Sequence, residues 1–182
     1  MRPLWALVLL LAATPAWAQQ VPEPEDYRME AYRAPVPESL TGGTVVSTDG
    51  ARDLAEDSSV LLIDVLPRPP KPKGLDPSIL WRPQPRHNIP GSIWLPNVGY
   101  GTLSPEMARH FEESLAALSE GDRARILLFY CQANCWMSWN AAKRAIALGY
   151  SRVHWYPEGT DGWQAAGLPT EYSEPEPSPE EP

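Results

Sequence analysis

Two cysteines separated by three residues, Cys131 and Cys135, are the residues whose type and spacing best suit chemistry. The preceding run, Ile126 to Tyr130, is apolar or aromatic throughout, which favours a short strand buried on both faces. After the cysteines, apolar residues recur at helical spacing until Gly149, which is placed to end a helix as its C-cap. The cysteines are therefore expected between the carboxyl end of a strand and the amino end of a helix. Free amides and the helix dipole favour a thiolate there.

This placement predicts thiol chemistry in which the two cysteines have different roles. Cys131, directly after the strand, is expected to be the nucleophile that takes up a sulfane sulfur or attacks a disulfide. Cys135 is expected to be the resolving thiol that closes an intramolecular disulfide. A permanent disulfide is the structural alternative, although loop entropy for so small a ring contributes only about 2 kcal/mol. The spacing leaves both interpretations open.

A copper site without enzymatic activity is a further alternative. Two thiolates suit Cu(I), with Met137 or His154 as a third ligand. The chain has no Cys-x-x-Cys-His haem attachment motif, and two cysteines exclude a four-cysteine zinc site. If the cysteines perform thiol chemistry, we expect no cofactor.

Other side chains are expected near the same edge of the sheet. Asp64 lies at the end of a second apolar run and either orients the cysteine loop through its amides or serves as a turn residue. The aromatic residues nearby either offer a stacking wall for a flat ligand such as a quinone or pack the core. They are Trp136, Trp139, Trp155, Tyr156 and Trp163.

The two ends of the chain differ from its middle. Residues 1–18 combine a positive start, a short apolar run and an Ala-x-Ala sequence, which predicts a cleaved signal peptide and an oxidising location outside the cytoplasm. No other stretch approaches the length of a membrane span. Residues 19–39 alternate proline and acidic residues like a linker. Residues 171–182 hold five glutamates and four prolines and are predicted to be a disordered acidic tail.

The remaining chain is long enough for one domain, residues 40–170. The net charge of −8 is concentrated in the tail, so the body is only mildly acidic and nucleic acid is not an expected partner. Residues 67–91 carry eight prolines and five basic residues against one aspartate. This segment is too long for an ordinary connection and is expected to be an insertion lying over one edge of the domain.

Strand and helix patterns alternate through the domain, which predicts an α/β fold with a mostly parallel sheet of about five strands and helices on both faces. Strands are expected at 44–46, 60–65, 92–95, 126–130 and 152–156. Helices are expected at 48–57, from Pro105 after a Ser104 cap, from the cysteine loop to Gly149, and at 161–166.

At several segments the chain resembles the rhodanese-like family. The similar segments are Leu62-Ile-Asp64-Val65, His87-Asn-Ile-Pro-Gly91-Ser-Ile93, Phe129-Tyr-Cys131, Leu148-Gly-Tyr150 and the closing Glu158 to Pro169. They occur in the family's order between about Leu40 and Thr170. The resemblance implies a three-layer domain, a nucleophilic Cys131 and sulfurtransferase-like activity.

The Cys-x3-Cys-Trp loop further resembles a secreted subfamily named for a CXXCW motif. That resemblance implies a periplasmic protein working with secreted redox proteins or dehydrogenases in catabolism dependent on pyrroloquinoline quinone (PQQ). The family loop usually carries cationic residues, whereas this one holds Gln132, Ala133, Asn134, Cys135, Trp136 and Met137. Binding of an anion such as thiosulfate would then rest on backbone amides and on Arg82 or Arg86.

Overall fold

A five-stranded parallel sheet forms the centre of the protein. The computed structural model describes residues 21–69, 71–76, 78–82 and 84–179. The strand order is β1-β6-β5-β2-β4, and every pair in this sheet is parallel. The strands are β1 (Thr44–Val45), β2 (Leu61–Asp64), β4 (Ile93–Trp94), β5 (Leu127–Tyr130) and β6 (Val153–Tyr156). The predicted α/β architecture is confirmed.

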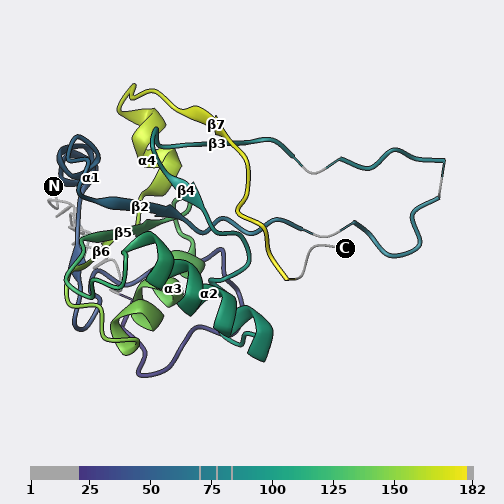
Figure 1. The fold of residues 1–182 in the computed structure, drawn as a ribbon. Helices are drawn as coiled ribbons and strands as arrows, with labels where there is room; N and C mark the ends of the chain where they lie inside the picture. The colour runs from purple at the N-terminus through teal and green to yellow at the C-terminus, as the bar shows by residue number, and fades with distance from the viewer. Residues whose placement is uncertain (1–20, 70, 77, 83, 180–182) are drawn as a thin grey trace, which may run out of the picture.

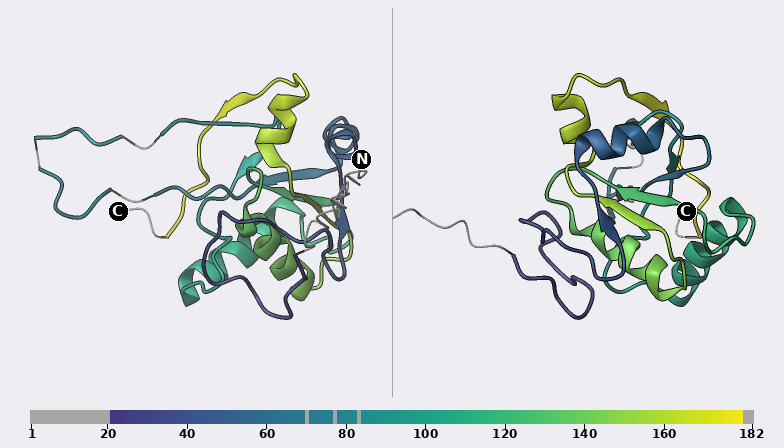
Figure 2. Two further views of the ribbon diagram at one scale, coloured as in Figure 1. Left: turned by 180° about the vertical axis from the view of Figure 1, so that it is seen from behind. Right: turned by 90° about the vertical axis from the view of Figure 1, so that its left-hand side faces the viewer.

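Helices cover both faces of the sheet (Figures 1 and 2). On one face lie α1 (Thr48–Ala55) and α4 (Gly159–Ala165), and on the other α2 (Pro105–Leu118) and α3 (Trp136–Ala147). Each face has its own apolar core. Leu128 and Tyr130 of β5 pack toward α1 and α4, whereas Phe129 and Cys131 pack toward α2 and α3. Alternation along the central strand thus directs Cys131 toward α3.

Local signals in the sequence account for the helix ends. Ser104 accepts a hydrogen bond from the amide of Met107 at 3.2 Å and is followed by proline at the first helical position. Gly149 follows α3 with φ +90° and donates its amide to Ile146 at 2.9 Å. α3 begins at Trp136, and no side chain caps its amino end. The sequence therefore has no capping residue that shows where this helix starts.

A second, two-stranded antiparallel sheet joins β3 (Arg86–Asn88) to β7 (Glu171–Ser173). Neither strand was expected. The prediction of a disordered tail from residue 171 is wrong for its first part, because the β3 pairing orders Glu171–Ser173 and the amide of Glu176 donates to the carbonyl of Trp94 at 2.8 Å. Residues 180–182 lie outside the described residues.

The proline-rich segment does not lie over one edge of the domain as expected. Residues 67–69, 71–76, 78–82 and 84–85 project away from the sheet as a long arm, teal in Figure 1, before the chain returns as β3. Arg82 is exposed in this arm.

Residues 21–39 pack along the side of the domain formed by α3 (purple in Figure 2). We call this segment the strap. It contributes partly buried apolar side chains to the core, among them Tyr32, Ala34 and Val36. The predicted signal peptide lies outside the described residues. Within the described part of the chain, no helix has the length and apolar character that crossing a membrane requires.

Candidate active site

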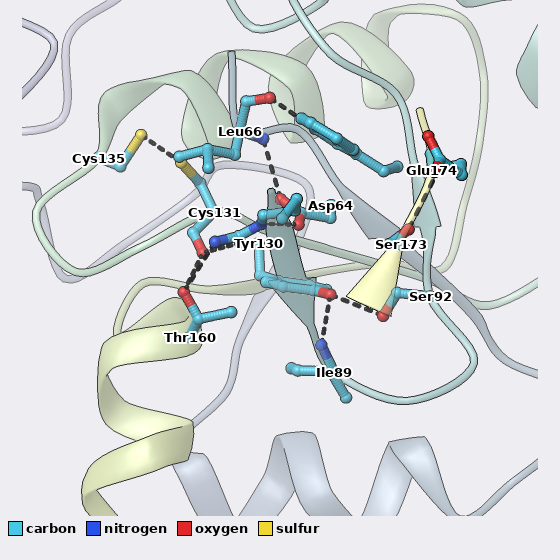
Figure 3. Close-up of polar contacts among 12 residues, drawn as sticks. Asp64, Leu66, Ile89, Ser92, Tyr130, Cys131, Cys135, Thr160, Ser173 and Glu174 are labelled. Atoms are coloured by element: carbon cyan, nitrogen blue, oxygen red, sulfur yellow. Dashed lines mark hydrogen bonds and ion pairs between the residues drawn. The ribbon is translucent and has the colours of Figure 1, made fainter. Parts of the chain in front are cut away.

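The two cysteines occupy opposite ends of a short loop between β5 and α3. Cys131 follows Tyr130, the last residue of β5, and Cys135 is the N-cap of α3. Their sulfur atoms are 2.7 Å apart, and the Cys131 thiol donates toward Cys135 (Figure 3). Cys131 is 0% exposed and Cys135 3%. The loop thus brings the two predicted site cysteines together in a buried setting.

The amino end of the helix stabilises Cys135 rather than Cys131. The pKa of Cys135 is lowered to about 7, chiefly by the hydrogen bond from Cys131 and also by the backbone N–H groups of Met137, Ser138 and Gln132, while burial acts in the opposite direction. Burial raises the pKa of Cys131 well above its ordinary value, and the neighbouring Cys135 raises it further. These pKa shifts run opposite to the expectation that the thiolate lies at Cys131. The group poised for ionisation is Cys135.

The backbone carbonyl of Cys131 is held by three donors. Arg86 Nη2 lies 3.2 Å from this oxygen, and Thr160 donates both its amide, at 3.1 Å, and its hydroxyl, at 3.2 Å (Figure 3). Thr160 belongs to α4, so the first turn of that helix and β3 together fix the backbone at Cys131. This brace orients the cysteine without touching its sulfur.

Arg86 does not have the role expected from the sequence, whereas Asp64 has the second of the two roles considered for it, that of a turn residue. Arg86 Nε pairs with Asp64 Oδ2 at 2.6 Å, and Asp64 is 0% exposed. The other Asp64 oxygen accepts the amide of Leu66 at 2.9 Å. Asp64 therefore acts on the loop only through Arg86, and the guanidinium is occupied by Asp64, Thr160 and the Cys131 carbonyl. The expected anion contact at Arg86 is replaced by a structural ion pair.

The middle of the loop rests on the start of α4. Gln132 forms a backbone bridge with Gly159, and the amide of Ala133 donates to Asp161 Oδ2 at 3.2 Å. Gly159 has φ +53°, and a Cβ there would lie 2.7 Å from the carbonyl carbon and oxygen of Cys131. Glycine is therefore required at this contact. Asn134, with φ +54°, is exposed at the tip of the loop.

The strap covers the helix end of the loop. The amide of Trp136 donates to the carbonyl of Tyr32 at 2.9 Å, and the amide of Ala34 donates to the carbonyl of Asn134 at 3.1 Å. Trp136 Nε1 donates to the carbonyl of Pro35 at 3.1 Å, and the Trp136 ring is only 2% exposed. The Trp136 ring, one of those that could offer a stacking wall, is therefore covered by the protein's own chain.

Asn140 fastens the strap and was not singled out in the sequence. Its side-chain oxygen accepts the amide of Arg28 at 2.9 Å, and its Nδ2 donates to the carbonyl of Arg28 at 2.9 Å and to that of Gly99 at 3.0 Å. Arg28 also lies 5.1 Å from the centre of the Trp136 ring. A buried amide with paired donors and acceptors explains why this polar residue is tolerated inside α3.

The aromatic residues do not form one wall. Trp139 and Trp155 belong to the core on the α2 and α3 side, whereas Tyr156 and Trp163 belong to the core on the opposite side. All of them are buried. The packing interpretation therefore accounts for these four rings.

The additional copper ligands considered from the sequence differ in their placement. Met137 is buried next to Cys135, where its backbone and Cβ closely approach Gly99. His154 pairs in register with Leu128, whose side chain is on the face opposite Cys131. Among the described residues, no group of three or more His, Cys, Asp or Glu side chains is placed to hold a metal ion.

Residues 47–166 match the rhodanese-like domain. The chain belongs to the rhodanese-like domain family. No curated protein matches it. Among solved structures, this rhodanese-like protein is similar to an uncharacterized protein from Saccharomyces cerevisiae, with 25% identity and a TM-score of 0.41 over 68% of this chain and 92% of the other.

Two further solved structures are similar to this rhodanese-like protein. The polysulfide-sulfur transferase homodimer from Wolinella succinogenes has 20% identity and a TM-score of 0.45, over 72% of this chain and 80% of the other. A complex of EanB with ergothioneine has 21% identity and a TM-score of 0.49. That match covers 72% of this chain and only 32% of the EanB chain.

Proposed function

We propose that this rhodanese-like protein performs thiol–disulfide redox chemistry, with Cys135 as the nucleophile and Cys131 as the resolving thiol. The observation that carries the proposal is the 2.7 Å separation of the two sulfur atoms. A disulfide bond is about 2.05 Å long, so only a small movement closes it. The burial of Cys131 and the amides around Cys135 support the exchange of the two roles relative to the expectation from sequence.

The redox step transfers two electrons. The Cys135 thiolate attacks a substrate disulfide and forms a mixed disulfide, which releases one substrate thiolate. Cys131 then loses its proton to that thiolate and attacks the Cys135 sulfur, which releases the second substrate thiolate. The protein is oxidised to the Cys131–Cys135 disulfide while the substrate is reduced to two thiols. The raised pKa of Cys131 keeps it protonated until this second step.

Sulfane-sulfur transfer is the second candidate, and membership of the rhodanese-like family favours it. Here the Cys135 thiolate accepts a sulfur atom from a polysulfide and becomes a persulfide. Attack by Cys131 on the inner sulfur releases hydrosulfide and leaves the same intramolecular disulfide. An external thiol must then reduce the pair to complete the cycle.

The sulfur separation favours a disulfide over a shared copper ion. Two thiolates bound to one ion at about 2.3 Å each lie about 3.8 Å apart in a tetrahedral arrangement. The cysteines are closer than that, and the third ligand would have to be Met137, whose side chain is buried in the core.

The same proposal includes a location and a setting. The protein acts in the periplasm after removal of residues 1–18, as an accessory of PQQ-dependent alcohol catabolism. The signal sequence and the Cys-x3-Cys-Trp motif support these two points. Fractionation of the native host and growth of a deletion strain on alcohols test them. Retention in the cytoplasm, or unimpaired growth, would contradict them.

Equilibration in dithiothreitol redox buffers, followed by alkylation and intact-mass measurement, tests the redox function. We expect a reversible two-electron transition in the wild type and none in Cys131→Ser or Cys135→Ser. Polysulfide should leave a persulfide on Cys135 in Cys131→Ser. A disulfide that never opens under mild reductant would indicate a structural staple. A stoichiometric Cu(I) complex with no reversible disulfide would favour metal binding.

A further inference from the structure

The strap pairs with the loop of residues 131–135, which we call the redox loop, as a β-strand pairs with its neighbour. Hydrogen bonds flank Cys135 on both sides: Trp136 N–H to Tyr32 C=O, and Ala34 N–H to Asn134 C=O. Arg33 and Cys135 therefore face each other as an antiparallel pair without hydrogen bonds of its own. Residues in such a pair have Cα atoms about 4.5 Å apart and side chains on the same side.

This pairing limits what can react with Cys135. The residue is 3% exposed and its main chain is paired with Tyr32, Arg33 and Ala34, so displacement of these three residues offers a substrate disulfide a route to it. Their departure frees one main-chain donor, on Trp136, and one main-chain acceptor, on Asn134. A fully deprotonated sulfur anion such as thiosulfate accepts from the first but has no proton to donate to the second. An extended polypeptide satisfies both, as the strap does.

We infer that the substrate of the cysteine pair is a disulfide in an extended segment of a partner protein, which binds Asn134–Trp136 in place of residues 32–34. This inference rests on the proposed thiol–disulfide function. A substrate cysteine in the register of Arg33 lies opposite Cys135, and a Cα separation of about 4.5 Å falls within the range of a disulfide. Nucleophilic attack then proceeds as described above, with the partner's disulfide as the oxidant of the protein dithiol.

The surroundings of the strap indicate which neighbours such a cysteine has. The Tyr32 ring contacts the Tyr100 ring edge to face at 5.5 Å, and its hydroxyl accepts the amide of Gly101 at 3.1 Å. An aromatic residue directly before the substrate cysteine occupies the same place. Arg33 itself is exposed, so another side chain can take its place opposite Cys135 without loss of core packing.

Reaction of the Cys131→Ser, Ala34→Pro double variant with peptides copied from the strap tests the inference. Serine prevents resolution, and proline removes the strap's amide to Asn134. Two peptides copy residues 29–37 and carry one cysteine, activated as a 2-thiopyridyl disulfide, in place of either Arg33 or Ala34. We expect the first to modify Cys135 about tenfold faster than the second. Equal rates for the two peptides would overturn the inference.

Two further measurements separate the possible failures. Cysteamine activated with the same group reports the intrinsic reactivity of Cys135. If it does not react either, the proposed function itself has failed. If the proline variant does not fold, the double variant Arg33→Cys, Cys131→Ser reads the same geometry. It should form an intrachain disulfide with Cys135, whereas Ala34→Cys in the same background should not. A disulfide in neither or in both variants would contradict the register.

Discussion

Arg86 meets Cys131 at the backbone carbonyl, 3.2 Å from Nη2, and leaves the sulfur to Cys135. Its Nε meanwhile neutralises the buried carboxylate of Asp64 at 2.6 Å. One guanidinium thus joins β2, β3 and the start of the redox loop. The sequence predicted that the positive charge of Arg86 would bind an anionic substrate. In the structure this charge instead holds the protein's own backbone at Cys131.

Replacing Arg86 by alanine should lower the free energy of unfolding by about 3–5 kcal/mol, because Asp64 is left as an unpaired buried charge. Urea denaturation of the reduced protein measures the loss. The double variant Arg86→Met, Asp64→Asn removes both charges and should recover part of it. An unchanged urea midpoint in Arg86→Ala, with binding of thiosulfate abolished, would instead return Arg86 to an anion-binding role.

The ionisation of Cys135 depends on its partner. In the reduced protein, the thiolate absorbance at 240 nm should rise as the pH increases through about 7, because Cys131 and the helix amides lower the pKa of Cys135. Cys131→Ala removes the largest of these contributions, so the transition should move to higher pH. In Cys135→Ala the remaining thiol should titrate well above its ordinary range, because it is buried. A transition that stays near 7 in Cys131→Ala would contradict this coupling.

Gly159 is placed where a side chain cannot fit. We expect Gly159→Ala to destabilise the protein by about 1–3 kcal/mol, because its φ is +53° and the new Cβ would lie 2.7 Å from the Cys131 carbonyl. Gly167→Ala is the matched control, since Gly167 also has positive φ but a Cβ there would meet no atom within 4 Å. Urea midpoints of the two variants should differ clearly. Equal losses would show that backbone conformation alone, without contact at Cys131, sets the cost.

Asn140 should control access to the redox loop. Asn140→Ala removes two hydrogen bonds to Arg28, which should increase opening of the strap roughly fivefold to thirtyfold. Trypsin cleavage after Arg28 and Arg33 reports this opening. Lys143→Ala is the control, because Lys143 makes one long hydrogen bond to the strap, 3.4 Å to the carbonyl of Pro24, and otherwise acts on it through its charge near Glu23. Cleavage that follows global unfolding of Asn140→Ala, as measured in urea, would mean that the strap does not open separately.

The central part of the fold follows from local sequence. The apolar run before Cys131 and the C-cap at Gly149 place β5 and α3 on either side of the cysteines, and alternation of strands and helices predicts the parallel sheet. The two strands that were missed, β3 and β7, are three residues long each and pair only with one another across 80 or more residues. Such short strands carry no periodic signal.

The details of the site depend on tertiary contacts that spacing does not encode. The start of α3 has no side-chain cap. The sequence therefore does not indicate which of the two cysteines accepts hydrogen bonds from the N–H groups of the helix. The ion pair of Arg86 with Asp64 joins residues 22 positions apart through a projecting arm. The strap has a linker-like composition and is ordered by α3 through Asn140 and by main-chain pairing. Thr160, which donates to the Cys131 carbonyl, lies in the segment from Glu158 to Pro169 that resembles the family. The resemblance implied no role for this residue.

The rate at which each cysteine alone attacks an aromatic disulfide reagent, 5,5′-dithiobis(2-nitrobenzoate), tests the assignment of roles most directly. At pH 7 we expect Cys131→Ser to form a stable adduct on Cys135 about tenfold faster than Cys135→Ser reacts at Cys131, since Cys135 keeps the backbone N–H groups that lower its pKa whereas burial raises the pKa of Cys131. The wild type should release two equivalents of thiolate and end as the internal disulfide. Faster reaction at Cys131 than at Cys135 would contradict the account.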